Sequence, residues 1–427
     1  MKIQISHGRV INPATGDDAV QDVFIAAGKI VGLGLQPAGF TPNRIIDARH
    51  KIVMPGLVDL AARLREPGYE YLAKLESEMF AATVGGVTSL SCPPDTDPPL
   101  DEPGLVEMLK HRAKGRNQTN VYPLGALTQQ LQGTRLTEMG ELREAGCVAF
   151  SQANAPLMDT QVLSRALDYA ATFGFSVWLQ PLDPHLARGG VAHDGEVATR
   201  LGLPPIPACA ETIALSTILH LVRHTQARVH LCRLSSAAGL ELVRAAKQEG
   251  LPVTCDISIN QLHLTEHDIG FFNPHCHLIP PLRSLRDRDA LRAGLAEGIV
   301  DALVSDHSPV NAETKQVPFE AAEPGATGLE LLLPLALQWA RESGIALPQA
   351  LSRITADPAR ILGIPAGQIT LGSPADVCIF NPAQEWVVTP QSLKSQGKNT
   401  PFLNLPLQGK VSHTIVGGFL IYEDARA

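Results

Sequence analysis

The chain has no paired cysteines, no basic run and no long apolar segment. Its seven cysteines are scattered singly without a Cys-x-x-Cys pair, which is typical of reduced thiols in the cytoplasm. The net charge of −8 and the absence of a Lys/Arg cluster argue against nucleic acid or an anionic membrane as a partner. No apolar run approaches the roughly 20 residues that a bilayer span needs. The first residues, MKIQIS, lack a signal h-region, so a cytoplasmic location is expected.

Both ends of the chain have the pattern of short β-strands. From Met1 to about Val53, short apolar runs alternate with Gly, Asn and Asp, and residues 372–380 and 410–422 have the same texture. Neither end holds enough strands for a stable sheet of its own. We therefore predict a small composite β-sandwich domain built from residues 1–53 and 364–427.

The middle of the chain alternates apolar strands with amphipathic helical patterns, as parallel β/α units do. The candidate strands are residues 88–92, 148–150, 176–179, 229–232, 253–257 and 302–304. Helical spacing of apolar residues is clear in 159–173, 211–224 and 236–249. This pattern predicts an α/β fold, a (β/α)8 TIM-type barrel over residues 54–363. In such a barrel the chemistry lies at the C-terminal ends of the strands.

The stretch 54–68 should carry one such site. Apolar residues from Ile52 to Leu60, broken only by Pro-Gly, read as a buried strand that leads into a polar loop. Side chains two apart on a strand share a face, so histidines at positions 61 and 63 would grip one metal ion. Those positions hold Ala61 and Arg63. Alanine offers no ligand atom, and a guanidinium stays protonated.

In every other respect this stretch resembles the dihydroorotase family of the amidohydrolase superfamily, whose members read Gly-Leu-Val-Asp-Leu-His-x-His-Leu-Arg-Glu-Pro-Gly at this point. The resemblance spans essentially the whole chain and includes the stretches 183–190, 196–204, 210–214, 280–283, 305–309, 318–319 and 398–402. It implies a barrel in which strand-end histidines and a bridging acid hold two zinc ions. A metal-bound hydroxide would then open or close a cyclic amide, with an aspartate moving the proton.

Carried over position by position, the resemblance places most zinc ligands where this chain has other residues. Gln152 and Ala153 stand in the segment of the family's bridging aspartate, and Gln180 and Arg233 align with its two further histidines. Only Asp306 remains, where the family has its last metal ligand and general base. Because a catalytic zinc ordinarily has about three protein ligands, the prediction is that zinc is absent and that no metal or catalytic residue is present.

The family's substrate-binding positions differ as well. Arg65 remains, and its family equivalent receives the substrate's carboxylate. Asp95 replaces a neutral asparagine, and we expect it to pair with Arg65 and to repel a carboxylate. Ile279 and Val310 replace an asparagine and a histidine, so both positions lose hydrogen-bonding capacity. No substrate-binding residue is therefore assigned.

Two arginines, Arg63 and Arg233, stand where the family has metal-binding imidazoles. A pocket that keeps Asp306 but loses a dication would hold an uncompensated carboxylate. We predict an ion pair between Asp306 and one of the two arginines, and the sequence does not say which. The alternative is that both arginines point into solvent at the barrel mouth, since arginine is mostly exposed.

Other histidines are weak candidates for a relocated metal site. His263 and His267 are four residues apart, but a helix start between them breaks their shared face. His275 and His277 flank a cysteine, and spacing alone is a weak pointer. His230 alternates inside a strand and is expected to be a hydrogen-bonded core residue.

The predicted function is that of a catalytically inactive dihydroorotase homologue, and so not that of an enzyme. The family includes inactive dihydroorotase-like chains that serve as non-catalytic subunits of aspartate carbamoyltransferase in pyrimidine biosynthesis. The resemblance thus implies assembly with the catalytic chain of that enzyme as a hetero-dodecamer. Two alternatives remain: a divergent amidohydrolase that acts on another cyclic amide through a relocated metal site, and a metabolite-binding regulatory subunit.

Overall fold

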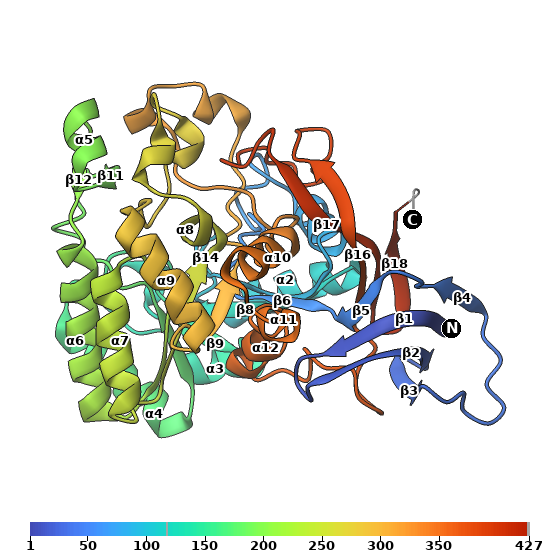
Figure 1. Cartoon of the computed structure of the whole chain (residues 1–427). Coiled ribbons are helices and arrows are strands. Elements are labelled where there is room, and N and C mark those ends of the chain that lie inside the picture. Colours follow the sequence, from blue (N-terminus) through green and yellow to red (C-terminus); the bar gives the residue numbers. More distant parts are fainter. Residues whose placement is uncertain (117, 425–427) are drawn as a thin grey trace.

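The computed structural model describes residues 1–116 and 118–424. Figure 1 shows a barrel of strands and helices beside a smaller sheet that carries both ends of the chain. The first strands, in blue, lie next to the last strands, in red, although they are far apart in sequence. This arrangement confirms the predicted fold class, a (β/α)8 barrel with a composite sheet from the two termini.

The terminal sheet has eight strands, and the short strand β5 (Ile52–Pro55) joins the strands of the N-terminal end to those of the C-terminal end. Its members are β1 (Lys2–Asn12), β2 (Asp17–Ala26), β3 (Lys29–Leu33), β4 (Arg44–Asp47), β5 (Ile52–Pro55), β16 (Val377–Val387), β17 (Pro406–Val416) and β18 (Phe419–Glu423). Val53 of β5 lies opposite Val10 of β1 on one side and Ile379 of β16 on the other. These three side chains belong to one buried apolar cluster, in which each contributes roughly 1.5 to 3 kcal/mol. Neither end of the chain would bury this face alone.

The barrel consists of eight parallel strands. They are β6 (Leu57–Asp59), β7 (Val87–Cys92), β8 (Asn120–Ala126), β9 (Ala149–Ser151), β10 (Ser176–Leu179), β13 (Arg228–Leu231), β14 (Val253–Ser258) and β15 (Ala302–Val304). Just beyond the first and last strands, a parallel bridge between Ala62 and His307 closes the ring, with Arg63 N donating to His307 O at 2.9 Å. All six strands expected from the middle of the sequence are present, and β8 is one that the sequence pattern did not single out.

The apolar run from Ile52 to Leu60 forms two strands, whereas the sequence suggested one. It divides at Gly56 into β5, which belongs to the terminal sheet, and β6, which opens the barrel. The division has a steric cause: a Cβ at residue 56 would lie 2.1 Å from Oγ1 of Thr88. Only glycine lets the chain pass this close while it changes sheets. The predicted domain limits, 1–53, 54–363 and 364–427, stay predictions.

Helices follow the barrel strands and cover the outside of the barrel. The longer ones are α1 (Leu75–Val84), α2 (Pro103–Arg116), α4 (Thr160–Phe173), α6 (Cys209–Thr225), α7 (Ala237–Gln248), α9 (Leu285–Glu297) and α10 (Leu332–Ser343). The shorter ones are α3 (Met139–Ala145), α5 (Glu196–Leu201), α8 (Ile259–His263), α11 (Leu347–Ser352) and α12 (Ala356–Leu362), and a two-stranded sheet of β11 (Ala192–His193) and β12 (Pro205–Ile206) lies beside α5. Asp159 and Ser236 cap α4 and α7 by accepting backbone N–H groups of the first turn. Both caps lie at the starts that the sequence predicted.

All seven cysteines are free thiols, and Cys209 is the one that is exposed. Within residues 1–116 and 118–424, no helix has both the length and the apolar character that a membrane crossing requires. The free thiols match the sequence-based expectation that the cysteines are reduced.

Candidate functional site

The residues that the sequence singled out meet at the C-terminal ends of the barrel strands. Arg63 follows β6, Asp95 follows β7, Gln180 follows β10, Arg233 follows β13 and Asp306 follows β15. Arg233 and Asp306 have left-handed backbone, with φ of 55° and 49°. Such backbone is uncommon outside glycine and clusters at functional sites. We call this group of five residues the mouth cluster.

Arg233 forms the ion pair with Asp306 that the sequence predicted. Its Nη1 lies 3.1 Å from Asp306 Oδ1, and its Nη2 donates to Gln180 Oε1 at 2.7 Å and to Asn154 Oδ1 at 2.5 Å. The side chains of Arg233 and Asp306 are only 6% and 8% exposed. The prediction is confirmed, and the alternative with both arginines in solvent is wrong.

Arg63 pairs with Asp95 rather than with Asp306. Its Nε lies 2.8 Å from Asp95 Oδ2. Burial opposes both charges, but the pairing outweighs burial, so the pKa of Asp95 is lowered and the pKa of Arg63 is raised. Burial raises the pKa of Asp306 even though Arg233 and Arg63 act against it. Two cations and two carboxylates thus balance one another in the mouth cluster.

The expected pairing of Asp95 with Arg65 is wrong. Arg65 lies on left-handed backbone with φ of 64°. Its side chain runs to the opposite loop, where Nε donates to Pro309 O at 2.9 Å and Nη2 donates to Ser308 Oγ at 3.1 Å. Burial, and then the neighbouring Arg63, lower the pKa of Arg65. Asp95 instead pairs with Arg63. The sequence suggested Arg63 only as a partner of Asp306.

The other positions at which the family has metal ligands or substrate-binding residues lie around the mouth cluster, and here they hold uncharged side chains. Gln152 is turned aside: its Oε1 accepts from Thr128 Oγ1 at 2.9 Å, and its Nε2 donates to Leu131 O at 2.8 Å. Ala61 and Ala153 line a cavity of only about 30 Å³ beside Arg63 and Arg233. A second cavity of about 30 Å³ is lined by Ile279 and Asp306, and Val310 is buried. Each cavity has room for little more than a water molecule.

The mouth cluster does not fit zinc. Asp306 is its only residue at a family ligand position that offers a carboxylate, and that carboxylate is already paired with Arg233. Gln180 offers a neutral amide oxygen that accepts from Arg233 as well. Zinc in proteins takes cysteine, histidine and carboxylate ligands, and a protonated guanidinium cannot be one. Side chains fill the position that the family resemblance assigned to two metal ions.

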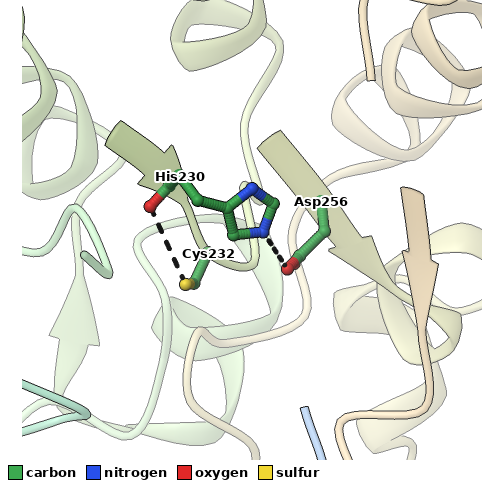
Figure 2. A group of neighbouring side chains, drawn as sticks. All are labelled: His230, Cys232 and Asp256. Carbon is green, nitrogen blue, oxygen red and sulfur yellow. Dashed lines mark hydrogen bonds and ion pairs between the residues drawn. The ribbon is translucent and has the colours of Figure 1, made fainter. Parts of the chain in front are cut away.

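A different group of potential ligands lies on the neighbouring strands β13 and β14. It comprises His230, Cys232 and Asp256. Figure 2 shows the ring of His230 directed at the carboxylate of Asp256, while the sulfur of Cys232 lies near the backbone oxygen of His230. One ligand atom from each lies within 4.8 Å of the others. His230 Nε2 is 2.8 Å from Asp256 Oδ2, and His230 Nδ1 is 2.8 Å from Thr254 Oγ1. We call these three residues the strand group.

The donor set of the strand group suits zinc. Imidazole nitrogen, thiolate sulfur and carboxylate oxygen are the three ligand types that zinc binds. Two ligand atoms on one tetrahedral zinc stand roughly 3.3 Å apart for bonds near 2.05 Å, so the bond between His230 and Asp256, at 2.8 Å, has to open slightly. Burial raises the pKa of the Cys232 thiol well above its usual range, and metal binding would have to displace that proton.

The sequence predicted His230 as a core residue but did not indicate its combination with Cys232. Its burial and its two hydrogen bonds confirm that it is a hydrogen-bonded core residue. The signal for a ligand group was the spacing of two residues on one strand, the same rule that applies to positions 61 and 63. Asp256 joins them because β14 pairs in parallel with β13, with Thr254 opposite His230.

Comparison with known proteins places the whole chain in one family. Residues 50–238 match the Dihydro-orotase-like family, and residues 166–421 match the Amidohydrolase family. A dihydroorotase-like protein of Pseudomonas aeruginosa is 45% identical over 423 residues, which cover 99% of this chain and 100% of that protein. The chain belongs to the dihydroorotase-like amidohydrolases. A dihydroorotase of Syntrophus aciditrophicus is 38% identical over 426 residues, again 99% of this chain and 100% of the relative.

Solved structures share the fold of this dihydroorotase-like chain. The L-hydantoinase (dihydropyrimidinase) from Arthrobacter aurescens superimposes with a TM-score of 0.88 at 24% identity, covering 99% of this chain and 96% of that one. The dihydropyrimidinase from Brevibacillus agri gives a TM-score of 0.84 at 20% identity, covering 99% and 95%. At this identity the likeness shows the fold alone.

The comparisons overturn the prediction that the chain is not an enzyme. Relatives with 38% and 40% identity over 99% of the chain are named dihydroorotase, which is a hydrolytic enzyme. The prediction was wrong because it equated the loss of the family's ligand positions with a loss of catalysis, which none of the comparisons indicates.

The predicted absence of metal is corrected as well. The dihydroorotase-like amidohydrolases are the family for which the resemblance implied metal chemistry, and the strand group offers three ligand atoms. The prediction considered the family's own ligand positions and several histidines, but not His230 together with Cys232 and Asp256. His230 and Cys232 lie three residues and one residue before Arg233, and Asp256 lies on the next strand, β14.

Proposed function

We propose that this dihydroorotase-like amidohydrolase is a subunit that assembles with the catalytic chain of aspartate carbamoyltransferase in pyrimidine biosynthesis. The observation that supports it most is the mouth cluster, in which Arg63–Asp95 and Arg233–Asp306 tie together the loops after four strands. These pairs fix the shape of the barrel mouth without a bound ion. A fixed surface suits an assembly subunit because little conformational entropy is lost on binding.

The form of the assembly is part of the proposal. The family resemblance suggests a hetero-dodecamer of equal numbers of the two chains. Seven free thiols suit the reducing cytoplasm, where that enzyme's pathway operates. The proposal concerns assembly and is independent of whether the chain also hydrolyses a cyclic amide.

Light scattering coupled to size-exclusion chromatography tests the assembly. The purified chain and the aspartate carbamoyltransferase catalytic chain of the same organism are run alone and then mixed in equal amounts. We expect a new peak that contains both chains in equal numbers and has the mass of a hetero-dodecamer. Elution of the two chains at their separate masses, at micromolar concentrations of each, would exclude the proposal.

A second candidate function is hydrolysis of a cyclic amide, with a metal held by His230, Cys232 and Asp256. The presence of three ligand types within 4.8 Å of one another in the strand group favours it. The named relatives and fold neighbours also point to this class of substrate, since dihydroorotate, hydantoin and dihydropyrimidines all contain a ring amide. When bound, a zinc ion would supply Lewis-acid chemistry to a substrate carbonyl.

Metal binding to the strand group can be measured without an activity assay. Cobalt(II) bound to a thiolate gives a charge-transfer absorption band, so the protein is titrated with cobalt and the band is recorded. We expect about one cobalt per chain and loss of the band in Cys232→Ser. Cys378→Ser is the matched control, because Cys378 is buried in the terminal sheet. An absent band, or an equal band in Cys232→Ser, would exclude the site. If the wild type binds cobalt as expected, turnover of the three ring amides is assayed on the metal-loaded protein.

A further inference from the structure

A cavity lies beside the barrel mouth, and Gln180 is the member of the mouth cluster that lines it. Its volume is about 340 Å³, and it is enclosed by the segment after β9, the loop after β10, and the helices α4 and α6. Pockets that bind small molecules have volumes of roughly 300 to 1,000 Å³. The cavity is therefore large enough for a compact metabolite and too small for a helix or a strand of a partner protein.

One part of the cavity wall is apolar, and the rest is polar. Leu163 of α4, Leu179 of β10 and Ile218 of α6 line it, and each is at least nine-tenths buried. Leu157 and Met158 line it from the segment after β9, and Met158 is half exposed. An apolar group placed here would be removed from water on several sides, which is favourable.

Gln180 supplies an unused donor at the edge of the cavity. Arg233 Nη2 donates to its Oε1 at 2.7 Å, and this fixes which end of the amide faces the guanidinium. Its Nε2 is buried and has no hydrogen-bond partner among the described residues. A buried donor without an acceptor is costly. Because a water molecule cannot reach Nε2, the amide of Gln180 has to turn toward the cavity before a carbonyl oxygen of a ligand can accept from it.

The rim of the cavity carries two side chains that are not engaged elsewhere in the described chain. His185 and Arg188 line the cavity and are exposed, and no hydrogen bond or ion pair of either side chain is found among residues 1–116 and 118–424. Asp183 orders their loop, because its Oδ1 accepts from His185 N at 3.0 Å and from Leu186 N at 2.9 Å. Arg188 is thus available for an anionic group, and a guanidinium matches a carboxylate in two-pronged geometry.

We infer that this cavity binds a small N-acyl amino acid or a compound of the same chemistry. The acyl body lies against Leu163, Leu179 and Ile218, the amide carbonyl accepts from Gln180 Nε2 once that side chain has turned, and the carboxylate faces Arg188. The binding is non-covalent and goes beyond the proposed function, since it involves neither the assembly nor the strand group. Its link to the mouth cluster is Gln180, whose Oε1 accepts from Arg233.

Fluorine NMR with N-(4-fluorobenzoyl)glycine tests the site on the full chain. We expect saturable broadening and a shift of the fluorine signal on the wild-type protein. Ala214→Trp should weaken binding by about tenfold or more, because Ala214 lines the cavity and an indole would fill it. Ile213→Trp is the matched control: the neighbouring side chain on α6 is 47% exposed and does not line the cavity. It should bind as the wild type does.

The carboxylate contact is tested separately with a neutral probe. Arg188→Ala should weaken the acid by roughly fivefold or more and leave the corresponding glycinamide unchanged, since only the acid has a charge for the guanidinium. Arg188 is exposed, so this variant is expected to fold, and its melting temperature is compared with that of the wild type. The inference fails if the wild type does not saturate, if Ala214→Trp binds like Ile213→Trp, or if Arg188→Ala weakens both probes equally.

Discussion

The mouth cluster and the strand group meet at strand β13 and use charge in opposite ways. In the mouth cluster, two permanently charged guanidiniums meet two carboxylates, Asp95 and Asp306. In the strand group, the imidazole of His230 is hydrogen-bonded to the carboxylate of Asp256, and the thiol of Cys232 donates to the backbone oxygen of His230. The first is a closed set of ion pairs, whereas the second keeps atoms that a metal ion could bind.

This difference shows that a few residues along a strand decide what a site can do. Cys232 and Arg233 are neighbours in sequence, yet Cys232 lies in the strand group and Arg233 lies in the mouth cluster. Adjacent residues at a strand end point in different directions. The loss of ligands at the mouth therefore says little about the residues just below it.

The largest expected effect comes from breaking the buried ion pair in the mouth cluster. Arg233→Met leaves Asp306 without its main cation in a buried position, which typically costs about 3 to 5 kcal/mol. The free energy of unfolding in urea measures the loss. The double variant Arg233→Met, Asp306→Leu should recover most of it, because no charge then remains buried. An equal loss in both variants would show that shape rather than charge holds the mouth together.

A buried carboxylate without an arginine gives a comparison with Asp306. Burial raises the pKa of Glu330 to about 7, while the N–H groups of Ser395 and Lys394 act to lower it. The folded protein thus holds this proton more tightly than the unfolded chain. The stability from Glu330 is full below about pH 4.5 and is lost as the pH rises through 7, by roughly 3 kcal/mol in all.

Glu330→Gln removes this titration and should flatten the pH dependence. Chemical unfolding at pH 5 and pH 8 is compared for the wild type and the variant. The wild type should lose more stability than the variant between these values. A difference that is the same at both pH values would mean that Glu330 does not titrate in this range.

Zinc should affect the strand group by a smaller amount. If zinc is present at 100 times its dissociation constant, the wild type gains about 2.7 kcal/mol of stability by mass action. Asp256→Asn should lose most of this gain, whereas Asp95→Asn in the mouth cluster should keep it. Thermal unfolding with and without zinc measures both. A loss of the gain in Asp95→Asn alone would place the metal at the mouth instead.

The smallest effect is expected for the outer ion pair of the mouth cluster. The side chain of Asp95 is 26% exposed and that of Arg63 is 9% exposed. Water therefore screens the pair only in part, and Asp95→Asn, which keeps an oxygen that can accept from Arg63, should cost about 1 to 2 kcal/mol. Urea unfolding of this variant beside Arg233→Met ranks the two pairs. A larger cost for Asp95→Asn than for Arg233→Met would show that the outer pair is the more important one.

Much of the fold follows from local patterns in the sequence. The alternation of apolar strands and helices predicted the barrel, and the strand texture of both ends predicted the shared sheet, because each depends on periodicity over a few residues. The split at Gly56 was missed because the close approach of Thr88 is a tertiary contact. An apolar run cannot report which sheet each half joins.

The candidate site was predictable only in part. The need to compensate Asp306 follows from burying a carboxylate, and that reasoning predicted an arginine partner. Which arginine it is depends on the path of each loop, and the left-handed backbone at Arg65 and Arg233 is not visible in the sequence. The strand group required the register of β13 against β14, which the order of residues along one strand does not contain.

Anomalous X-ray scattering at the zinc edge, on crystals grown with zinc, tests the contrast between the two regions. We expect a peak among His230 Nε2, Cys232 Sγ and Asp256, and no peak between Arg233 and Asp306. A peak at the mouth cluster, or no peak at the strand group, would show that the two regions do not differ in this way.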